Sequence, residues 1–146
     1  MGVIHPDITK AETLPARYYT NKDEYSNLLQ KFSSSWNFIG LESMLNDKNI
    51  IPVRIGDIPM ILTKSGSESQ CISNVCTHRG MILCDDDQSS SSINCPYHGR
   101  SFTLSGKMKH MPEFSQVENF PSLSDDLPSA KVCLLYTSPS PRDRSI

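Results

Sequence analysis

Two short segments near the middle of the chain carry the side chains best suited to binding a metal. The first offers Cys76 and His78, and the second, after sixteen intervening residues, offers Cys95 and His98. Thiolates and imidazoles are the usual protein ligands of zinc, copper and iron–sulfur centres. Each pair lies on a loop that contains a glycine and follows a predicted strand. These four residues are therefore predicted to form a metal centre.

The order of the four ligands distinguishes two kinds of metal centre. A structural zinc finger usually takes both cysteines from one turn and both histidines from another. Here each loop supplies one cysteine and one histidine. This order suits a centre with two metals, one bound by both thiolates and the other by both imidazoles, which is the ligand division of a Rieske cluster. A mononuclear zinc site with two cysteines and two histidines is the alternative.

The sequence around these ligands resembles the Rieske family over residues 36–121. Residues 76–80, CTHRG, and residues 95–99, CPYHG, look like the two cluster-binding loops of ring-hydroxylating oxygenase α subunits. The stretch MPEF at 111–114, after the second loop, belongs to the same resemblance. These motifs are specific to the family, because they combine ligand type, ligand order and loop glycines.

The resemblance implies one [2Fe–2S] cluster per chain. It implies that Cys76 and Cys95 bind one iron and that His78 and His98 bind the other. Such a cluster transfers one electron at a time, and its imidazoles carry a second ring nitrogen that can lose a proton on oxidation. Electron transfer and proton transfer are then coupled.

Three further positions bear on the type of cluster. The respiratory branch of the family adds a disulfide between the loops, but this chain has Met81 and Tyr97 where those cysteines would fall. The cluster is therefore expected to be of the oxygenase and ferredoxin kind, toward the lower part of the roughly −150 to +300 mV Rieske range. Arg100 stands where many oxygenase α subunits carry Trp, and its charge would either raise the potential or alter partner docking.

The resemblance also implies a function that needs a second iron site. In such oxygenases, electrons pass from an NAD(P)H-dependent reductase or a ferredoxin through the Rieske cluster to a mononuclear Fe(II). That iron is held by two histidines and a carboxylate, and it hydroxylates a small organic substrate with O₂. Beyond the cluster ligands only His5 and His110 remain, so this iron and its catalytic domain are expected outside the chain. The fragment alone is then not expected to be catalytically competent.

Two other functions remain open at this point. The first is a free-standing Rieske ferredoxin that ends near residue 132, and the second is a non-catalytic zinc-binding interaction domain. For the oxygenase, the expected partners are the electron donor, the protein's own catalytic domain and further copies of the same subunit, because family members are commonly homo-oligomers.

The elements expected to position the loops are mostly short strands. Apolar residues at 25, 28, 29 and 32, following Thr20 as the N-cap, predict one N-terminal amphipathic helix. Strands are predicted over residues 36–41, 50–55, 58–64 and 70–75, with a two-residue hairpin at 56–57. Pro59 suggests an edge position for its strand. The expected fold is mainly β, a small antiparallel β-sandwich or barrel with two cluster-binding loops.

Composition restricts the partners and the compartment. A chain of 146 residues with a formal net charge of −2 and scattered basic residues shows no footprint for nucleic acid or anionic membrane. No targeting segment or membrane span is visible, so a soluble, cytoplasmic protein is expected. Five cysteines are an odd number, which disfavours a disulfide framework. Cys71 and Cys84 are predicted to be small buried hydrophobic residues rather than ligands.

The chain is expected to have four parts. Residues 1–35 form a lead with the helix, residues 36–121 the Rieske domain, and residues 122–132 the start of a connector to a catalytic domain. Residues 133–146 are expected to be a non-native tail, because 133–143 match, codon for codon, one reading frame of a transposase-type sequencing adapter. A natural Pro/Ser linker is the alternative for the tail.

Overall fold

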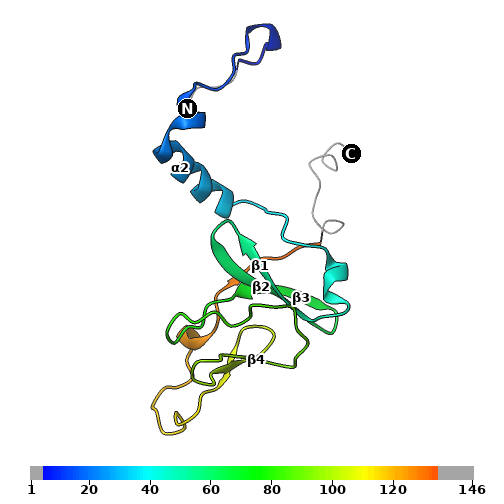
Figure 1. The fold of residues 1–146 in the computed structure, drawn as a ribbon, viewed down its shortest axis with the longest axis vertical. Helices are drawn as coiled ribbons and strands as arrows, with labels where there is room; N and C mark the ends of the chain where they lie inside the picture. The colour runs from blue at the N-terminus through cyan, green and yellow to red at the C-terminus, as the bar shows by residue number, and fades with distance from the viewer. Residues whose placement is uncertain (1–4, 135–146) are drawn as a thin grey trace. The chain divides into compact units, whose positions relative to one another are not determined.

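The chain divides into two compact units, Met1–Asn37 and Phe38–Ile146. The structure, a computed structural model, describes residues 5–134, which Figure 1 draws as a coloured ribbon. Among these residues the first unit is helical, and all of the strands belong to the second unit, the β-domain. The strands pair only in antiparallel fashion. The mainly β, antiparallel fold expected from the sequence is therefore confirmed.

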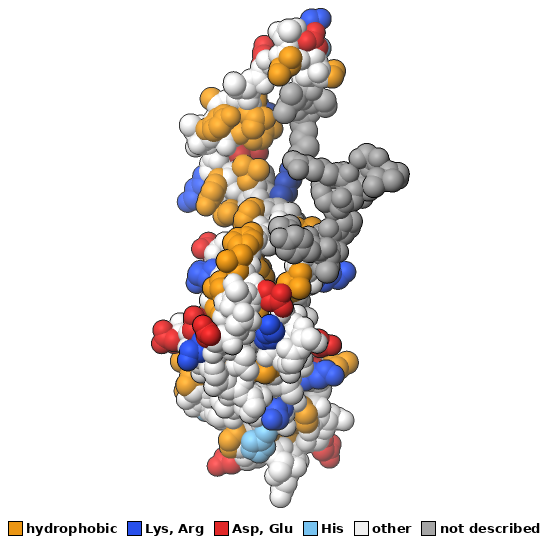
Figure 2. Space-filling model, turned by 90° about the vertical axis from the view of Figure 1, so that its right-hand side faces the viewer, with side chains coloured by type: hydrophobic (Ala, Val, Ile, Leu, Met, Phe, Trp, Pro, Cys, Tyr) orange, Lys and Arg blue, Asp and Glu red, His pale blue; other side chains and the backbone are white. Residues whose placement is uncertain are grey.

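The helical unit presents apolar side chains at its surface. Its elements are a 3₁₀ helix, η1 (Ile8–Lys10), a short helix, α1 (Arg17–Thr20), and a longer helix, α2 (Lys22–Ser33). The four apolar side chains that predicted α2 are all exposed, and Figure 2 shows hydrophobic groups on this unit's surface. None of the helices formed by residues 5–134 is long and apolar enough to cross a membrane.

The start of α2 corrects the predicted N-cap by one residue. The side-chain Oδ1 of Asn21 accepts hydrogen bonds from the backbone N–H groups of Asp23 and Glu24, as an N-cap does. Thr20 instead ends α1, and its hydroxyl donates to the carbonyl oxygen of Ala16. The error arose because Thr and Asn are both good caps, and the bend between α1 and α2 selects Asn21.

Residues 36–41 do not form the predicted first strand. They have no regular secondary structure, and a 3₁₀ helix, η2 (Glu42–Leu45), follows them. Trp36 and Phe38 are 69% and 84% exposed. Aromatic and β-branched composition favours a strand only where a neighbouring strand can pair with it, and no described strand pairs with this segment.

The main sheet of the β-domain has four antiparallel strands in the order β1-β2-β3-β7. Their bounds are β1 (Ile50–Ile55), β2 (Ile58–Ser65), β3 (Glu68–Ser73) and β7 (Ser129–Ala130). The predicted hairpin is confirmed: β1 pairs with β2 from Ile50↔Thr63 to Ile55↔Ile58. Gly56 in its turn has φ +59°, a conformation that glycine adopts without strain.

Pro59 does not mark an edge strand, contrary to the expectation. Strand β2 lies between β1 and β3, so it is central in the sheet. Pro59 is tolerated because it lies at the hairpin end of β2, where its carbonyl oxygen accepts from the N–H of Asn74 beyond the end of β3. A proline is excluded from a central strand only where its missing N–H is needed for the ladder.

A second, smaller sheet follows the metal-binding segments. It consists of β4 (Ile93–Asn94), β5 (Ser101–Phe102) and β6 (Met108–His110), in that order across the sheet. The turn at residues 104–106 joins β5 to β6. A last 3₁₀ helix, η3 (Leu123–Asp125), precedes β7.

Hydrophobic residues pack on both faces of the main sheet. Successive side chains of β2 point to opposite faces of the sheet, so Ile61 lies in one core and Met60 and Leu62 lie in the other. The larger core also holds Phe102 of the second sheet, which is fully buried. Burying one such side chain stabilises a fold by about 1.5–3 kcal/mol. Two of the predicted ligands, Cys76 and Cys95, belong to this same core, so the core and the loops are built together.

Residues 122–132, expected as the start of a connector, pack within the β-domain for much of their length. Strand β7 extends the main sheet beside β3. Leu127 lies in the larger core, and its N–H donates to the carbonyl oxygen of Gly106 at 2.8 Å. A role as a connector stays a prediction. Of the expected non-native tail, residues 135–146 lie outside the described residues.

Candidate metal centre

The two motif loops have the same backbone construction. In the first, the N–H of Cys76 donates to the carbonyl of Met81 at 2.8 Å, and the N–H of Gly80 donates to the carbonyl of Cys76 at 3.0 Å. In the second, the corresponding bonds run from Cys95 to Arg100 at 2.7 Å and from Gly99 back to Cys95 at 3.1 Å. Each loop is thus a closed turn that starts at its cysteine.

The loop glycines are required by this turn. Gly80 has φ +71° and Gly99 has φ +70°, in the left-handed region that L-residues with a Cβ avoid. At Gly99 a Cβ would also approach Cγ of Pro112 to 3.1 Å. The glycines named in the sequence motif therefore carry a backbone function.

The loops bring their two cysteines together inside the β-domain. Cys76 and Cys95 are 3% and 4% exposed, and the two thiols are neighbours, close enough for Cys95 to raise the pKa of Cys76. Burial raises the pKa of the Cys76 thiol, whereas a hydrogen bond from the backbone of His78 lowers it and the neighbouring Cys95 raises it further. Two thiols in contact within a core are suited to a positive metal ion, which favours their deprotonated form.

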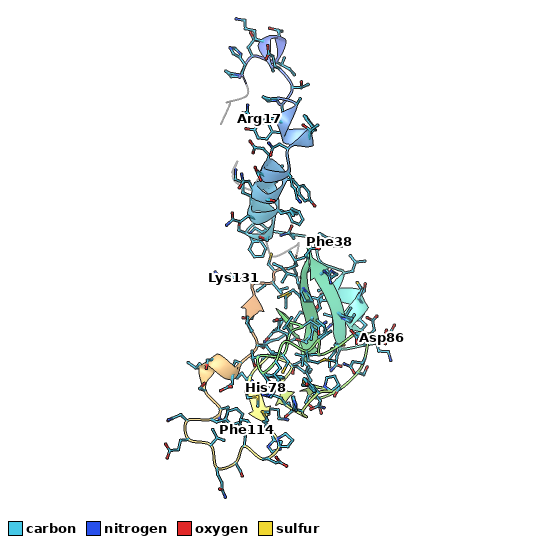
Figure 3. The ribbon with its side chains drawn as sticks, turned by 60° about the vertical axis from the view of Figure 1, so that its left-hand side comes forward. Arg17, Phe38, His78, Asp86, Phe114 and Lys131 are labelled. Atoms are coloured by element: carbon cyan, nitrogen blue, oxygen red, sulfur yellow. The ribbon has the colours of Figure 1, made fainter. Side chains whose placement is uncertain are left out.

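The two histidines also lie side by side, at the surface end of the loops. The ring centroids of His78 and His98 are 4.9 Å apart, with an angle of 66° between the planes. Burial lowers the pKa of the His78 imidazole, and the adjacent His98 ring lowers it further. The ring of Tyr97 stacks on His98 at 3.8 Å. In Figure 3, His78 lies beside the second sheet, at the opposite end of the β-domain from Phe38.

One atom of this group lacks the partner that burial demands. Nδ1 of His98 is buried and has no hydrogen-bond partner, and it is one of only four such side-chain atoms among residues 5–134. A second of the four, Nε of Arg100, lies on the same loop. Buried polar atoms without partners are rare and costly, so an unpaired ring nitrogen on the same loop as the buried Cys95 is what a metal ligand without its metal would show.

The donor set fits a two-iron cluster better than a single ion. The thiols of Cys76 and Cys95 form one pair, and the imidazoles of His78 and His98 form another. A structural zinc ion needs four ligands around one point, whereas each iron of a Rieske cluster takes only two from the protein. Paired thiols and paired imidazoles therefore fit a [2Fe–2S] group.

Behind the ligands lies a buried ion pair, of which the sequence revealed only one member. Arg100 is 4% exposed, and its guanidinium donates to Oγ1 of Thr77 at 2.7 Å and to Oδ1 of Asp125 at 2.9 Å. Of the two roles left open for Arg100, an effect on partner docking is disfavoured, because a buried side chain presents no surface to a partner. Asp125 carried no sequence signal, since it lies far from both motifs.

The remaining candidates are not brought to the site. Cys71 and Cys84 are buried as predicted, at 1% and 4% exposure, and no disulfide forms among the described cysteines. His5 and His110 are exposed. A buried residue that the sequence did not single out, Asn74, holds the first loop to its return segment: its amide donates to the carbonyl of Cys84 and accepts from the N–H of Cys84.

Comparison with known proteins finds similar sequences over most of the chain. Residues 35–121 match a family model described as the Rieske [2Fe–2S] domain. The carnitine monooxygenase oxygenase subunit of Escherichia coli (strain K12) is 31% identical over 117 residues, which are 77% of this chain and 31% of that protein. The chloroplastic choline monooxygenase of Arabidopsis thaliana is 28% identical over 121 residues, or 81% of this chain and 28% of that one.

Solved structures give the same result for the fold. The crystal structure of a quaternary ammonium Rieske monooxygenase with its substrate L-carnitine superimposes with a TM-score of 0.76 and 26% identity. It covers 83% of this chain and 36% of that one. The chain thus spans about a third of the length of the relatives that it matches.

Proposed function

Since this chain belongs to the Rieske [2Fe–2S] domain family, whose domain carries one [2Fe–2S] cluster, we propose that Cys76 and Cys95 bind one iron of that cluster. His78 and His98 then bind the other iron. The observation that carries this proposal is the buried, unpartnered Nδ1 of His98, whose ring lies 4.9 Å from that of His78 on loops that also pair two buried thiols. The bound cluster supplies one-electron redox chemistry.

The side chains around the site define how an electron and a proton would be handled. His98 would hold the iron through its unpartnered Nδ1, and its Nε2 would then be the nitrogen that can hold or release a proton. Tyr97 is 56% exposed and stacks on one face of that imidazole, so it shields this face of the ring from solvent. The buried cysteines are kept away from solvent.

For the whole protein we propose the oxygenase function of the relatives. The domain would receive electrons from an NAD(P)H-dependent reductase or a ferredoxin and deliver them to a mononuclear Fe(II) in a catalytic domain. There O₂-dependent hydroxylation of a small organic substrate would take place, within a homo-oligomer. The relatives named above are oxygenases, which supports the reaction class. The residues of this chain do not indicate which substrate is used.

The extent of the matches favours the oxygenase over a free-standing ferredoxin. The Rieske model covers residues 35–121, but the alignments with the oxygenases extend over 77% to 83% of the chain, beyond the Rieske domain. The complete reading frame at the natural locus tests this. A downstream pattern of two histidines and a carboxylate is expected, and a stop codon close to Val132 would favour the ferredoxin.

Reconstitution of the purified chain with iron and sulfide under anaerobic conditions tests the ligand assignment. We expect the visible absorption and electron paramagnetic resonance spectra of a mixed Cys/His [2Fe–2S] cluster, with iron and sulfide bound in equal amounts. His78→Ala and His98→Ala should abolish these spectra, whereas the matched control His110→Ala should keep them. Colourless protein, or stoichiometric zinc in its place, would contradict the assignment.

The cytoplasmic location stays a prediction. Fractionation of cells that express the natural gene would check it.

A further inference from the structure

A buried ion pair joins both motif loops to the segment that precedes β7. Arg100 follows the second loop, Thr77 lies inside the first, and Asp125 ends η3. The guanidinium of Arg100 contacts both partners, at 2.7 Å to Thr77 Oγ1 and at 2.9 Å to Asp125 Oδ1. The Thr77 hydroxyl donates in turn to the carbonyl oxygen of Asp125 at 2.7 Å. The three residues form a closed triangle of short hydrogen bonds.

The acidic member of the triangle is held as a charged group. Oδ2 of Asp125 accepts from the backbone N–H and the hydroxyl of Ser122, each at 2.9 Å. The guanidinium carbon of Arg100 lies 5.5 Å from the centre of the Phe120 ring, close enough for a cation–π contact. The side chains of Arg100 and Asp125 are only 5% and 20% exposed. Both charges are therefore fixed in place and largely shielded from water.

Opposite charges fixed next to a redox centre act on its potential in opposite directions. A nearby cation favours the reduced, more negative state, and a nearby anion favours the oxidised state. Because these two charges are buried, salt and water screen them less than surface charges. While they are paired, their effects on a neighbouring group largely cancel.

We propose that Arg100 and Asp125 are positioning residues that tune the reduction potential of the cluster from behind the two loops: each fixed charge alone shifts the potential, and the ion pair keeps the two shifts in balance. This inference rests on the proposed function, because it needs the cluster to be bound by Cys76, His78, Cys95 and His98. It goes beyond that function in assigning Asp125, which lies outside both motifs, a role in the redox chemistry. Thr77 links the pair to the first loop.

The test measures reduction potentials of the full 146-residue chain after reconstitution with iron and sulfide. Dithionite donates one electron to each cluster during an anaerobic redox titration, which visible and electron paramagnetic resonance spectra follow. Asp125→Asn should raise the midpoint potential because it leaves the Arg100 charge uncompensated. Arg100→Gln should lower it for the opposite reason. The double variant should lie between the two single variants and closer to wild type than either.

Matched controls separate charge from general damage. Arg54 and Asp57 form an ion pair at 3.8 Å whose side chains are 62% and 98% exposed. Arg54→Gln and Asp57→Asn remove the same charges at the surface and should leave the potential unchanged. Arg100→Lys keeps the charge but loses the planar fork, so its potential should stay near wild type even if its thermal stability falls. A purely structural role would not produce opposite shifts.

Each result decides the proposal. If Asp125→Asn and Arg100→Gln shift the potential in the same direction, or neither shifts it while the spectra are retained, the inference is wrong and the proposed function stands. If wild-type protein forms no [2Fe–2S] cluster, both are overturned. If Arg100→Gln fails to assemble a cluster, the variants Asp125→Asn and Arg100→Lys still test the proposal. A raised potential in Asp125→Asn together with an unchanged potential in Arg100→Lys would support it. Any other pair of results would contradict it.

Discussion

Among residues 5–134 only three polar or charged side chains are classed as buried, and each one joins segments that are distant in the sequence: Thr63, Asn74 and Arg100. Thr63 donates to the carbonyl of Leu104 at 2.6 Å, which links the main sheet to the turn of the second sheet. Arg100 and Asn74 hold the two motif loops. At the scale of single residues, buried polarity is concentrated where the loops must be held still, because an unpaired buried group is costly.

Cys71 illustrates how burial decides the chemistry of a thiol. Burial raises the pKa of Cys71 from its ordinary value of 9.0 to about 11, so at pH 9 an unfolded chain would ionise this thiol to a far greater extent than the native one. We expect iodoacetamide at pH 8.5 to label the exposed Cys133 rapidly and to spare Cys71, because the thiolate is the nucleophile. Labelling of Cys71 should appear only with urea unfolding. Peptide mass spectrometry measures both rates, and equal labelling of the two cysteines in native protein would contradict the prediction.

At the scale of elements, the first loop depends on one amide side chain. Asn74→Ala should destabilise the β-domain by about 2–5 kcal/mol, because it leaves the N–H and the carbonyl of Cys84 buried without their partner. Urea unfolding followed by circular dichroism measures this change. Asn94→Ala, at an exposed position, is the matched control and should change stability by no more than about 0.5 kcal/mol. Equal effects of the two substitutions would show that Asn74 does not hold the loop.

Substitutions at two turn glycines would distinguish the stability cost of backbone strain from the stability cost of crowding. Gly66 and Gly106 both have positive φ, +62° and +82°. A Cβ added at Gly66 would have no heavy atom within 4 Å. A Cβ added at Gly106 would lie 3.3 Å from atoms of Ile72 and Leu127. Gly66→Ala should cost about 1 kcal/mol from its backbone conformation. Gly106→Ala should cost about 1–3 kcal/mol more, because the neighbours must move. Thermal unfolding of both variants compares them, and a smaller loss for Gly106→Ala would argue against the packing of residue 127 on this turn.

At the scale of the molecule, the metal centre and the larger core are one structure. Cys76 and Cys95 pack with Ile50, Ile61 and Phe102, so the proposed ligands are anchored by residues of both sheets. Residues 122–130 close the same core through Leu127 and β7. A cluster bound to these cysteines would therefore tie together segments that also meet through apolar contacts and through the hydrogen bonds of Arg100.

Cluster binding should consequently stabilise the β-domain. A group that binds only the native state shifts the folding equilibrium, by about 2.7 kcal/mol at a hundredfold excess over its dissociation constant, which corresponds to at least about 10 °C for a domain of this size. Anaerobic calorimetry of iron-loaded and iron-free protein measures the difference. His98→Ala, treated in the same way, should show no gain. Identical unfolding temperatures for the loaded and iron-free wild-type protein would contradict the coupling.

Features set by neighbouring residues could be predicted from the sequence. The hairpin at Gly56 needs only a glycine between two apolar runs, and each motif loop needs only a cysteine, a histidine and a glycine within five positions. The amphipathic period found α2 for the same reason, although the choice between Thr20 and Asn21 as its cap depended on where α1 ends. Such signals lie within a few residues of one another, so the backbone geometry that they impose is local.

Only the tertiary structure decided which predicted strands were paired and which charged residues formed ion pairs. Residues 36–41 have strand-like composition but no neighbouring strand, and Pro59 lies in a central strand at the one end where its missing N–H is not needed. Arg100 was visible in the motif, but its partner Asp125 is 25 residues away, and Thr77 is 48 residues from that same aspartate. Contacts over such separations form because apolar burial brings the segments together, and no short stretch of sequence contains that information. The sequence alone therefore determined the chemistry of the four proposed ligands, whereas the packed fold determined which charges surround them.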